Sequence, residues 1–162
     1  MSRLVIISGG QTGVDRGALD AALQAHAPCG GWCPEGRESE DGPIPDYYPV
    51  HEIPGGGYIR RTRQNVEDSD GTLVLTFGTA TGGTARTIDF CRELGKPHLI
   101  IDADGTSIED AERLTLEFVR AHDLAYLNVA GPRASVDGRG YWYARGLIGR
   151  LLRPEPPMSN HQ

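Results

Sequence analysis

The chain lacks most of the residue patterns that mark metal-dependent, disulfide-bonded or membrane-spanning proteins. Its three cysteines form no CxxC pair, and its five histidines form no HxxxH pair or Cys/His ligand spacing. No GxSxG elbow is present, so a serine triad has no recognisable nucleophile. No apolar run approaches the roughly 18 residues that a membrane-spanning helix needs. These absences argue against a metal centre, a serine hydrolase and a membrane protein.

Basic residues are fewer than acidic ones, 16 against 22, and this restricts the partners of the chain. A formal net charge of -6 argues against general binding of nucleic acid, which needs a basic face. The arginines are scattered apart from a cluster at Arg60, Arg61 and Arg63, and this distribution suits a small anionic ligand. The odd number of cysteines and the lack of a secretory signal predict a cytoplasmic protein.

Short apolar segments, rich in β-branched residues, alternate with helical segments along the chain. Strands are expected at residues 3–8, 31–33, 71–77, 98–101 and 126–130, and helices at 14–26, 58–68, 83–94, 108–122 and 141–152. This alternation predicts a single three-layer α/β Rossmann-like domain over residues 1–152, with a mostly parallel sheet of about five strands flanked by helices. Residues 153–162 begin with a proline-rich stretch and are predicted to be a disordered tail.

Residues 34–57 show little periodicity and are rich in proline, glycine, aspartate and tyrosine. A loop of about 20 residues inside a compact domain is uncommon, and such loops are usually functional or mobile. This one carries Arg37, Glu40 and Asp41, so it is a candidate to close over a bound ligand.

Two glycine-rich turns each follow an apolar strand and open a helix. The first is Ser8–Gly13 and the second is Thr79–Thr84. Glycine permits a tight turn and a close approach of the ligand, and the free N–H groups at the start of the following helix attract an anion. Both turns and Gly131-Pro132-Arg133 follow parallel strands, so we expect three loops to meet in one ligand site at the carboxyl edge of the sheet.

Polar side chains in these turns offer further contacts. Gln11 and Thr12 can donate to phosphate oxygens, while Asp15 either accepts from a sugar hydroxyl or simply complements the helix dipole. Arg86 lies near the start of a helix, where it either holds an anion or pairs with Asp89. The first turn is not a GxGxxG fingerprint and lacks the lysine of a P-loop, so neither nucleotide motif applies.

Several segments resemble the bacterial family that is labelled putative molybdenum carrier. In chain order they are Ser8–Arg16, Gly31–Arg37, Glu40–Pro45, Arg63–Asn65, Asp68–Thr72, Thr81–Thr84 and Leu127–Arg133. That family is similar to the lysine-decarboxylase-like, or "lonely guy", phosphoribohydrolases of the Rossmann-like superfamily. The resemblance implies a nucleotide-type ligand at the glycine turns and homo-oligomers. The family label comes from an algal protein that carries molybdenum cofactor, a pterin bearing a phosphate.

One motif departs from the phosphoribohydrolase pattern GGxGTxxE, whose glutamate assists glycosidic cleavage. Here the turn is Gly82-Gly83-Thr84, and the third residue after Thr84 is Thr87. Asp89 follows two residues later, about 200° away around a helix. The resemblance therefore supplies no acid at this position. In a phosphoribohydrolase, Asp15, Glu40 or Asp89 would promote departure of the base.

We therefore expect a carrier that binds molybdenum cofactor or another phosphorylated, nucleotide-like ligand, without a structural metal. The predicted ligand contacts are Gly9, Gly10, Gln11, Thr12, Gly13, Asp15, Arg37, Asn65, Gly82, Gly83, Thr84, Arg86 and Arg133. Arg37 and Arg133 are expected to complete an anion clamp as bidentate donors. Two alternatives stay open: a phosphoribohydrolase acting on nucleoside monophosphates, and a nucleotide-sensing oligomeric scaffold. The expected partners are the small anionic ligand and further copies of the chain, as a dimer or tetramer, but neither nucleic acid nor a membrane.

Overall fold

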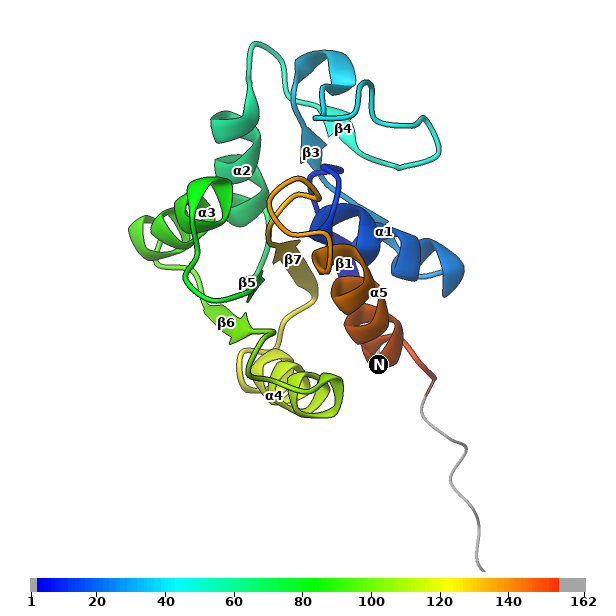
Figure 1. The fold of residues 1–162 in the computed structure, drawn as a ribbon, viewed down its shortest axis with the longest axis vertical. Helices are drawn as coiled ribbons and strands as arrows, with labels where there is room; N and C mark the ends of the chain where they lie inside the picture. The colour runs from blue at the N-terminus through cyan, green and yellow to red at the C-terminus, as the bar shows by residue number, and fades with distance from the viewer. Residues whose placement is uncertain (1–2, 155–162) are drawn as a thin grey trace, which may run out of the picture.

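A computed structural model describes residues 3–154, which fold around a five-stranded parallel sheet (Figure 1). Its strands are β1 (Val5–Ile7), β2 (Cys29–Gly30), β5 (Gly71–Thr76), β6 (His98–Asp102) and β7 (Tyr126–Ala130). Their order across the sheet is β2-β1-β7-β5-β6, and every neighbouring pair runs parallel. The predicted Rossmann-like α/β fold is confirmed.

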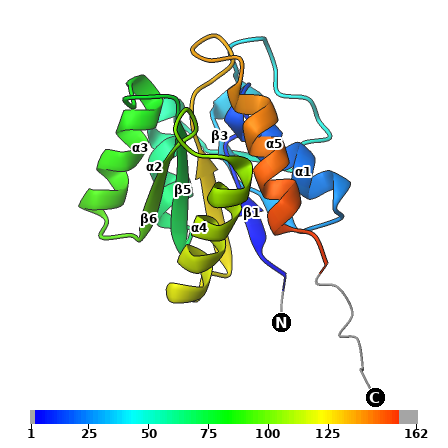
Figure 2. The same cartoon turned by 60° about the horizontal axis from the view of Figure 1, so that its bottom comes forward.

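Helices cover both faces of this sheet. In the described residues they are α1 (Val14–Gln24), α2 (Tyr58–Glu67), α3 (Gly82–Glu93), α4 (Ile108–Ala121) and α5 (Gly140–Leu151). Helices α1, α4 and α5 lie on one face, and α2 and α3 lie on the other (Figure 2). The chain moves from β1 to β2 and from β5 to β6 in opposite directions across the sheet. Right-handed crossovers therefore place α1 and α3 on opposite faces.

The main core lies between the sheet and helices α1, α4 and α5. Alternate residues of β5, Leu73 and Leu75, face this layer and are fully buried, because successive side chains of a strand point to opposite faces. Helices α1 and α5 approach closely at Gly17, where a side chain would overlap the carbonyl of Tyr141. This close packing fixes the start of α1 beside the loop that follows β7.

The second strand differs from the one predicted. Residues 32–33 do form a strand, β3 (Trp32–Cys33), but it pairs with β4 (His51–Glu52) in a separate two-stranded sheet. The strand beside β1 in the main sheet is β2, whose two residues are too few to give a periodic signal in the sequence. Gly31 separates β2 from β3 with a φ of 141°, and a Cβ there would overlap the carbonyl oxygen of Ser8.

The segment 34–57 is held by its own side chains rather than by long regular elements. It contains a 3₁₀ turn at Glu35–Arg37 and the strand β4. Its buried residues Ile44, Tyr48 and Val50 pack against Leu19 of α1 in a second, smaller core. This packing attaches the segment to the outer side of α1.

No helix within residues 3–154 is both long and apolar enough to cross a membrane. The predicted disordered tail, residues 153–162, lies outside the described residues except for Arg153 and Pro154.

Candidate functional site

A cavity of about 430 Å³ lies at the carboxyl ends of β1 and β7, next to α2 and the start of α3. This is the point where the connections leaving β1 and β5 diverge across the sheet, which is where ligands bind in open α/β folds. The volume falls within the range of small-molecule sites. Both glycine turns and the loop after β7 contribute to its wall, so the structure brings the three predicted loops together.

The second glycine turn is open toward this cavity. Helix α3 begins at Gly82, its N-cap is Thr81, and no side chain caps it. Gly82 has a φ of 53°, and a Cβ at Gly83 would meet no atom within 4 Å. The N–H groups of the first helical turn have no partners within the helix, so those of Gly82, Gly83 and Thr84 are available to an anion in the cavity.

The first glycine turn is packed into the protein instead. The amide of Gln11 donates to the carboxylate of Asp15 at 3.3 Å, and the amide of Thr12 donates to the side chain of Gln11 at 3.0 Å. Gly13 has a φ of 84°, and a Cβ there would lie 2.5 Å from the carbonyl oxygen of Pro132. These amides already have protein partners, so this turn does not offer the free cradle that the sequence suggests.

The predicted residues of the first turn therefore divide into two groups. Gly9, Gln11 and Asp15 line the cavity, whereas Gly10, Thr12 and Gly13 do not. All the other predicted residues except Arg37 do line it, namely Asn65, Gly82, Gly83, Thr84, Arg86 and Arg133.

A buried ion pair forms part of the cavity wall. Nη1 of Arg61 lies 3.6 Å from Oδ2 of Asp15, and the two side chains are only 9% and 13% exposed. The same Nη1 donates to the carbonyl of Gly9 at 3.0 Å. Burial raises the pKa of Asp15, and the positive charge of Arg61 opposes that rise. Nε of Arg61 is buried and has no hydrogen-bond partner among the described residues.

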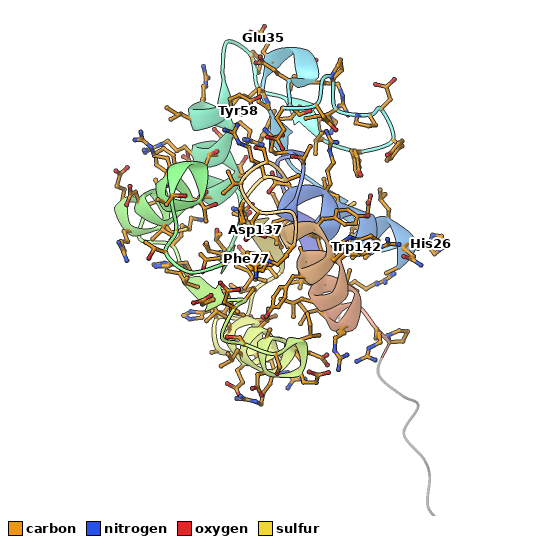
Figure 3. The ribbon with its side chains drawn as sticks, in the orientation of Figure 1. His26, Glu35, Tyr58, Phe77, Asp137 and Trp142 are labelled. Carbon is orange, nitrogen blue, oxygen red and sulfur yellow. The ribbon has the colours of Figure 1, made fainter. Side chains whose placement is uncertain are left out.

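Arg61 is not among the predicted ligand contacts, because the sequence shows it only as one member of the cluster Arg60, Arg61 and Arg63. The helical spacing of α2 was the available signal. Tyr58, Arg61, Thr62 and Asn65 are related by steps of three and four residues, so they share one face, and all four line the cavity. Figure 3 shows Tyr58 at the first turn of this helix.

Two further arginines border the cavity. Arg86 is exposed at the start of α3 and forms no ion pair within the described chain, so the alternative pairing with Asp89 is not observed. Nε of Arg133 lies 3.5 Å from a carboxylate oxygen of Glu40. Arg86 is thus the more available of the two for a ligand.

Glu40 attaches the segment 34–57 to the loop after β7. It accepts hydrogen bonds from the hydroxyl of Thr12 and from the amide of Ser135, the latter at 3.1 Å, and its own amide donates to Gln11 at 3.0 Å. Burial raises the pKa of Glu40, but the hydrogen bonds from Ser135 and Thr12 outweigh it, and the net shift is downward. The carboxylate does not border the cavity, so its position is that of a structural tether.

Asn65 borders the cavity, but its amide is engaged by the backbone. It accepts from the amide of Trp32 at 2.8 Å and donates to the carbonyl of Trp32 at 2.9 Å. Asn65 therefore joins α2 to β3, and its polar atoms are less available to a ligand than the sequence suggests.

Arg37 lies away from the cavity and organises the segment 34–57. Its guanidinium donates to backbone carbonyls at 2.8–3.1 Å, those of Ile44, Pro45, Tyr48 and Val50. These four bonds occupy the planar group that an anion clamp would need. In the structure Arg37 is a loop-organising residue rather than a cavity residue.

Substituting this arginine tests that assignment. Arg37→Lys is expected to lower the free energy of unfolding by about 2 kcal/mol, because an ammonium cannot make the planar set of bonds to several carbonyls. Ligand affinity is expected to be unchanged, since the residue does not touch the cavity. Chemical denaturation and calorimetric titration of the same samples check both parts, and a loss of affinity without a loss of stability would contradict the assignment.

Within residues 3–154, no three His, Cys, Asp or Glu side chains come together in a group that could hold a metal ion. The groups on the cavity wall are instead helix N–H groups, arginines, threonines and one carboxylate. These are groups that recognise phosphates and polar organic molecules.

The fold is that of a Rossmann-like α/β domain, and a cavity lies at the switch point of its sheet. Residues 6–152 match the model of the Circularly permutated YpsA SLOG family, and the chain belongs to that family. Its structure is similar to the crystal structure of a putative molybdenum carrier protein from Syntrophus aciditrophicus SB. The two share 45% sequence identity over 94% of this chain and 96% of that chain, with a TM-score of 0.91. The predicted family relationship is thereby confirmed. No curated protein sequence matches the chain.

Proposed function

We propose that this chain is a carrier that binds a small phosphorylated ligand, either the pterin of molybdenum cofactor or a nucleotide. The observation that carries the proposal is the open first turn of α3 on the wall of a cavity that also contains Arg61 and Arg86. The name of the similar Syntrophus protein supports a ligand related to molybdenum cofactor, whose organic part bears a phosphate.

The phosphate would bind at α3. Free N–H groups, the positive end of the helix dipole and the Arg86 guanidinium all favour negative charge at this position. The hydroxyl of Thr84 would add a donor from the same turn. The rest of the ligand would then extend along the face of α2 that carries Tyr58 and Arg61.

The residue pattern favours binding over hydrolysis. The position of the phosphoribohydrolase glutamate holds Thr87, whose hydroxyl donates to the carbonyl of Gly83 at 3.0 Å within α3. Asp89 is exposed and does not border the cavity. Neither residue can supply a proton to a leaving base.

One observation favours the phosphoribohydrolase as a second candidate. Asp15 borders the cavity, and burial raises its pKa, as is common for a general acid. Incubation with nucleoside monophosphates, followed by chromatography for the free base, tests this. The carrier proposal predicts no release of base, whereas release that disappears in Asp15→Asn would establish the enzyme.

Arg86→Gln is expected to weaken binding of a phosphorylated ligand by about tenfold, because it removes one charge-assisted contact worth roughly 1–2 kcal/mol. Its stability is expected to be unchanged, since the side chain is exposed and has no ion-pair partner in the described chain. Arg92→Gln is the matched control, because Arg92 is exposed on the same helix but remote from the cavity. Equal affinities of the two variants would contradict the proposed phosphate position.

The whole proposal is tested by thermal unfolding and calorimetric titration with GMP, AMP and a pterin carrying a side-chain phosphate. A ligand at about 100 times its Kd stabilises a protein by about 2.7 kcal/mol, so binding is readily detected. The proposal requires that at least one of these compounds binds and that its dephosphorylated form binds more weakly. Failure of every phosphorylated compound to bind would refute it.

A further inference from the structure

A carboxylate in the wall of a cavity favours the parts of a ligand that donate hydrogen bonds. Asp15 borders the cavity and is 13% exposed. An ionised carboxylate only accepts hydrogen bonds, so it repels a phosphate and attracts N–H or O–H groups. The part of the ligand that meets Asp15 therefore carries donors and is not the phosphate that would bind at α3.

Asp15 is accompanied by a donor and by a flat apolar surface. Arg61 lies 3.6 Å from the Asp15 carboxylate, and the carbon of its guanidinium lies 5.5 Å from the centre of the Tyr58 ring. Tyr58 and its neighbour Ile59 also border the cavity and are 37% and 58% exposed. A planar heterocycle can lie on this surface with its polar edge toward the ion pair.

We infer that Asp15 and Arg61 select a ring with a 2-amino-4-oxo pyrimidine edge, the edge shared by guanine and pterin, and reject adenine. This inference rests on the proposed function, because it names the ring of the ligand proposed for the same cavity. A ring N–H and an exocyclic amino group donate to the two oxygens of Asp15, and the neighbouring carbonyl oxygen accepts from Arg61. Adenine instead presents a ring nitrogen acceptor, which an ionised carboxylate repels, and it offers no carbonyl oxygen to Arg61.

Calorimetric titration of the unmodified protein with four ligands tests the selection. GMP and a pterin carrying a side-chain phosphate are expected to bind at least about tenfold more tightly than AMP, since a good bidentate pair discriminates by that amount or more. XMP, in which a carbonyl replaces the 2-amino group, is expected to bind as weakly as AMP. The tighter binder of these two then shows whether the cavity prefers a guanine nucleotide or a pterin. Binding of AMP as tight as that of both GMP and the pterin overturns the inference.

The variant Asp15→Asn tests whether the carboxylate causes the preference for GMP over AMP. The preference for GMP over AMP is expected to fall to near unity, and thermal unfolding of the same sample shows whether the variant is folded. Asp20→Asn is the control, because Asp20 lies on the same helix and accepts from the hydroxyls of Tyr48 and Tyr141 outside the cavity. Its preference for GMP is expected to match that of the unmodified protein.

Three other outcomes are informative. If Asp15→Asn weakens the binding of GMP and AMP equally but leaves the binding of their 2′-deoxy forms unaffected, Asp15 contacts the ribose hydroxyl and the inference is overturned. If phosphorylated ligands bind without preference for the ring and Asp15→Asn changes nothing, the inference fails while the proposed function stands. If no phosphorylated ligand binds, both fail.

Discussion

Gly13→Ala is expected to be among the most destabilising single substitutions in the chain, whereas Gly83→Ala leaves the fold intact. Gly13 has a φ of 84°, and its added Cβ would lie 2.5 Å from the oxygen of Pro132 and 2.9 Å from the amide nitrogen of Ala134. Backbone strain and overpacking each cost about 1–3 kcal/mol, so we expect a loss of about 3 kcal/mol. For a domain of this size the melting temperature should fall by about 10 °C.

Gly83→Ala is the matched control from the other glycine turn. A Cβ there meets no atom within 4 Å, and alanine is a better helix former than glycine by about 0.5–1 kcal/mol. Thermal unfolding should therefore show equal or slightly higher stability for this variant. Equal destabilisation of the two variants would contradict the view that the first turn is packed and the second is open.

Arg61→Met is expected to cost about 3 kcal/mol of stability at neutral pH, because removing one partner of a buried ion pair leaves the other charge uncompensated. Both side chains of the Arg61–Asp15 pair are almost completely buried, which is the situation where this cost is largest. Chemical denaturation measures the loss directly. The double variant Asp15→Asn, Arg61→Met should recover most of the lost stability, since it removes both charges together.

The loss in Arg61→Met should depend on pH. Burial raises the pKa of Asp15 above its ordinary value of 3.8, so the folded state binds this proton more tightly than the unfolded state. The resulting stability is fully present below the ordinary pKa and is lost as the pH rises through the raised pKa. Removing Arg61 takes away the charge that opposes the rise, so the pKa of Asp15 should rise further.

The free energy of unfolding of Arg61→Met should therefore fall further below that of the unmodified protein as the pH is raised from about 4 to about 8. At the acid end a larger fraction of Asp15 is protonated and needs no cation, so the two proteins should be closest in stability there. The double variant lacks Asp15, so its stability should show no further loss of this kind as the pH rises. A deficit that is the same at all pH values, or that shrinks toward alkaline pH, would rule out Asp15 as its cause.

The sequence predicts the architecture well because its signals are local. The β-branched runs and the glycines that end them mark β1, β5 and β7, and the strand predicted at residues 126–130 matches the observed one. The gathering of three loops at one cavity follows from their common position after parallel strands, once the fold class is known.

What the sequence does not predict depends on contacts whose partners the residue types alone do not identify. The first glycine turn looks like an anion cradle, but it is filled by Pro132 and Ala134, about 120 positions away in the chain. Arg37 looks like a ligand clamp, yet it binds the carbonyls of its own loop. Arg61 stands out in the sequence only as a member of an arginine cluster, and only the helical spacing of α2 assigns it to the cavity.

The central claim is that the phosphate binds at the open turn of α3 and not at the packed turn before α1. Backbone amide NMR during titration with GMP and with guanosine tests it most directly, because the difference between the two ligands isolates the phosphate. We predict that the phosphate-dependent shifts concentrate on the amides of Gly82, Gly83 and Thr84. Phosphate-dependent shifts at Gly10–Gly13, with the start of α3 unaffected, would contradict the account.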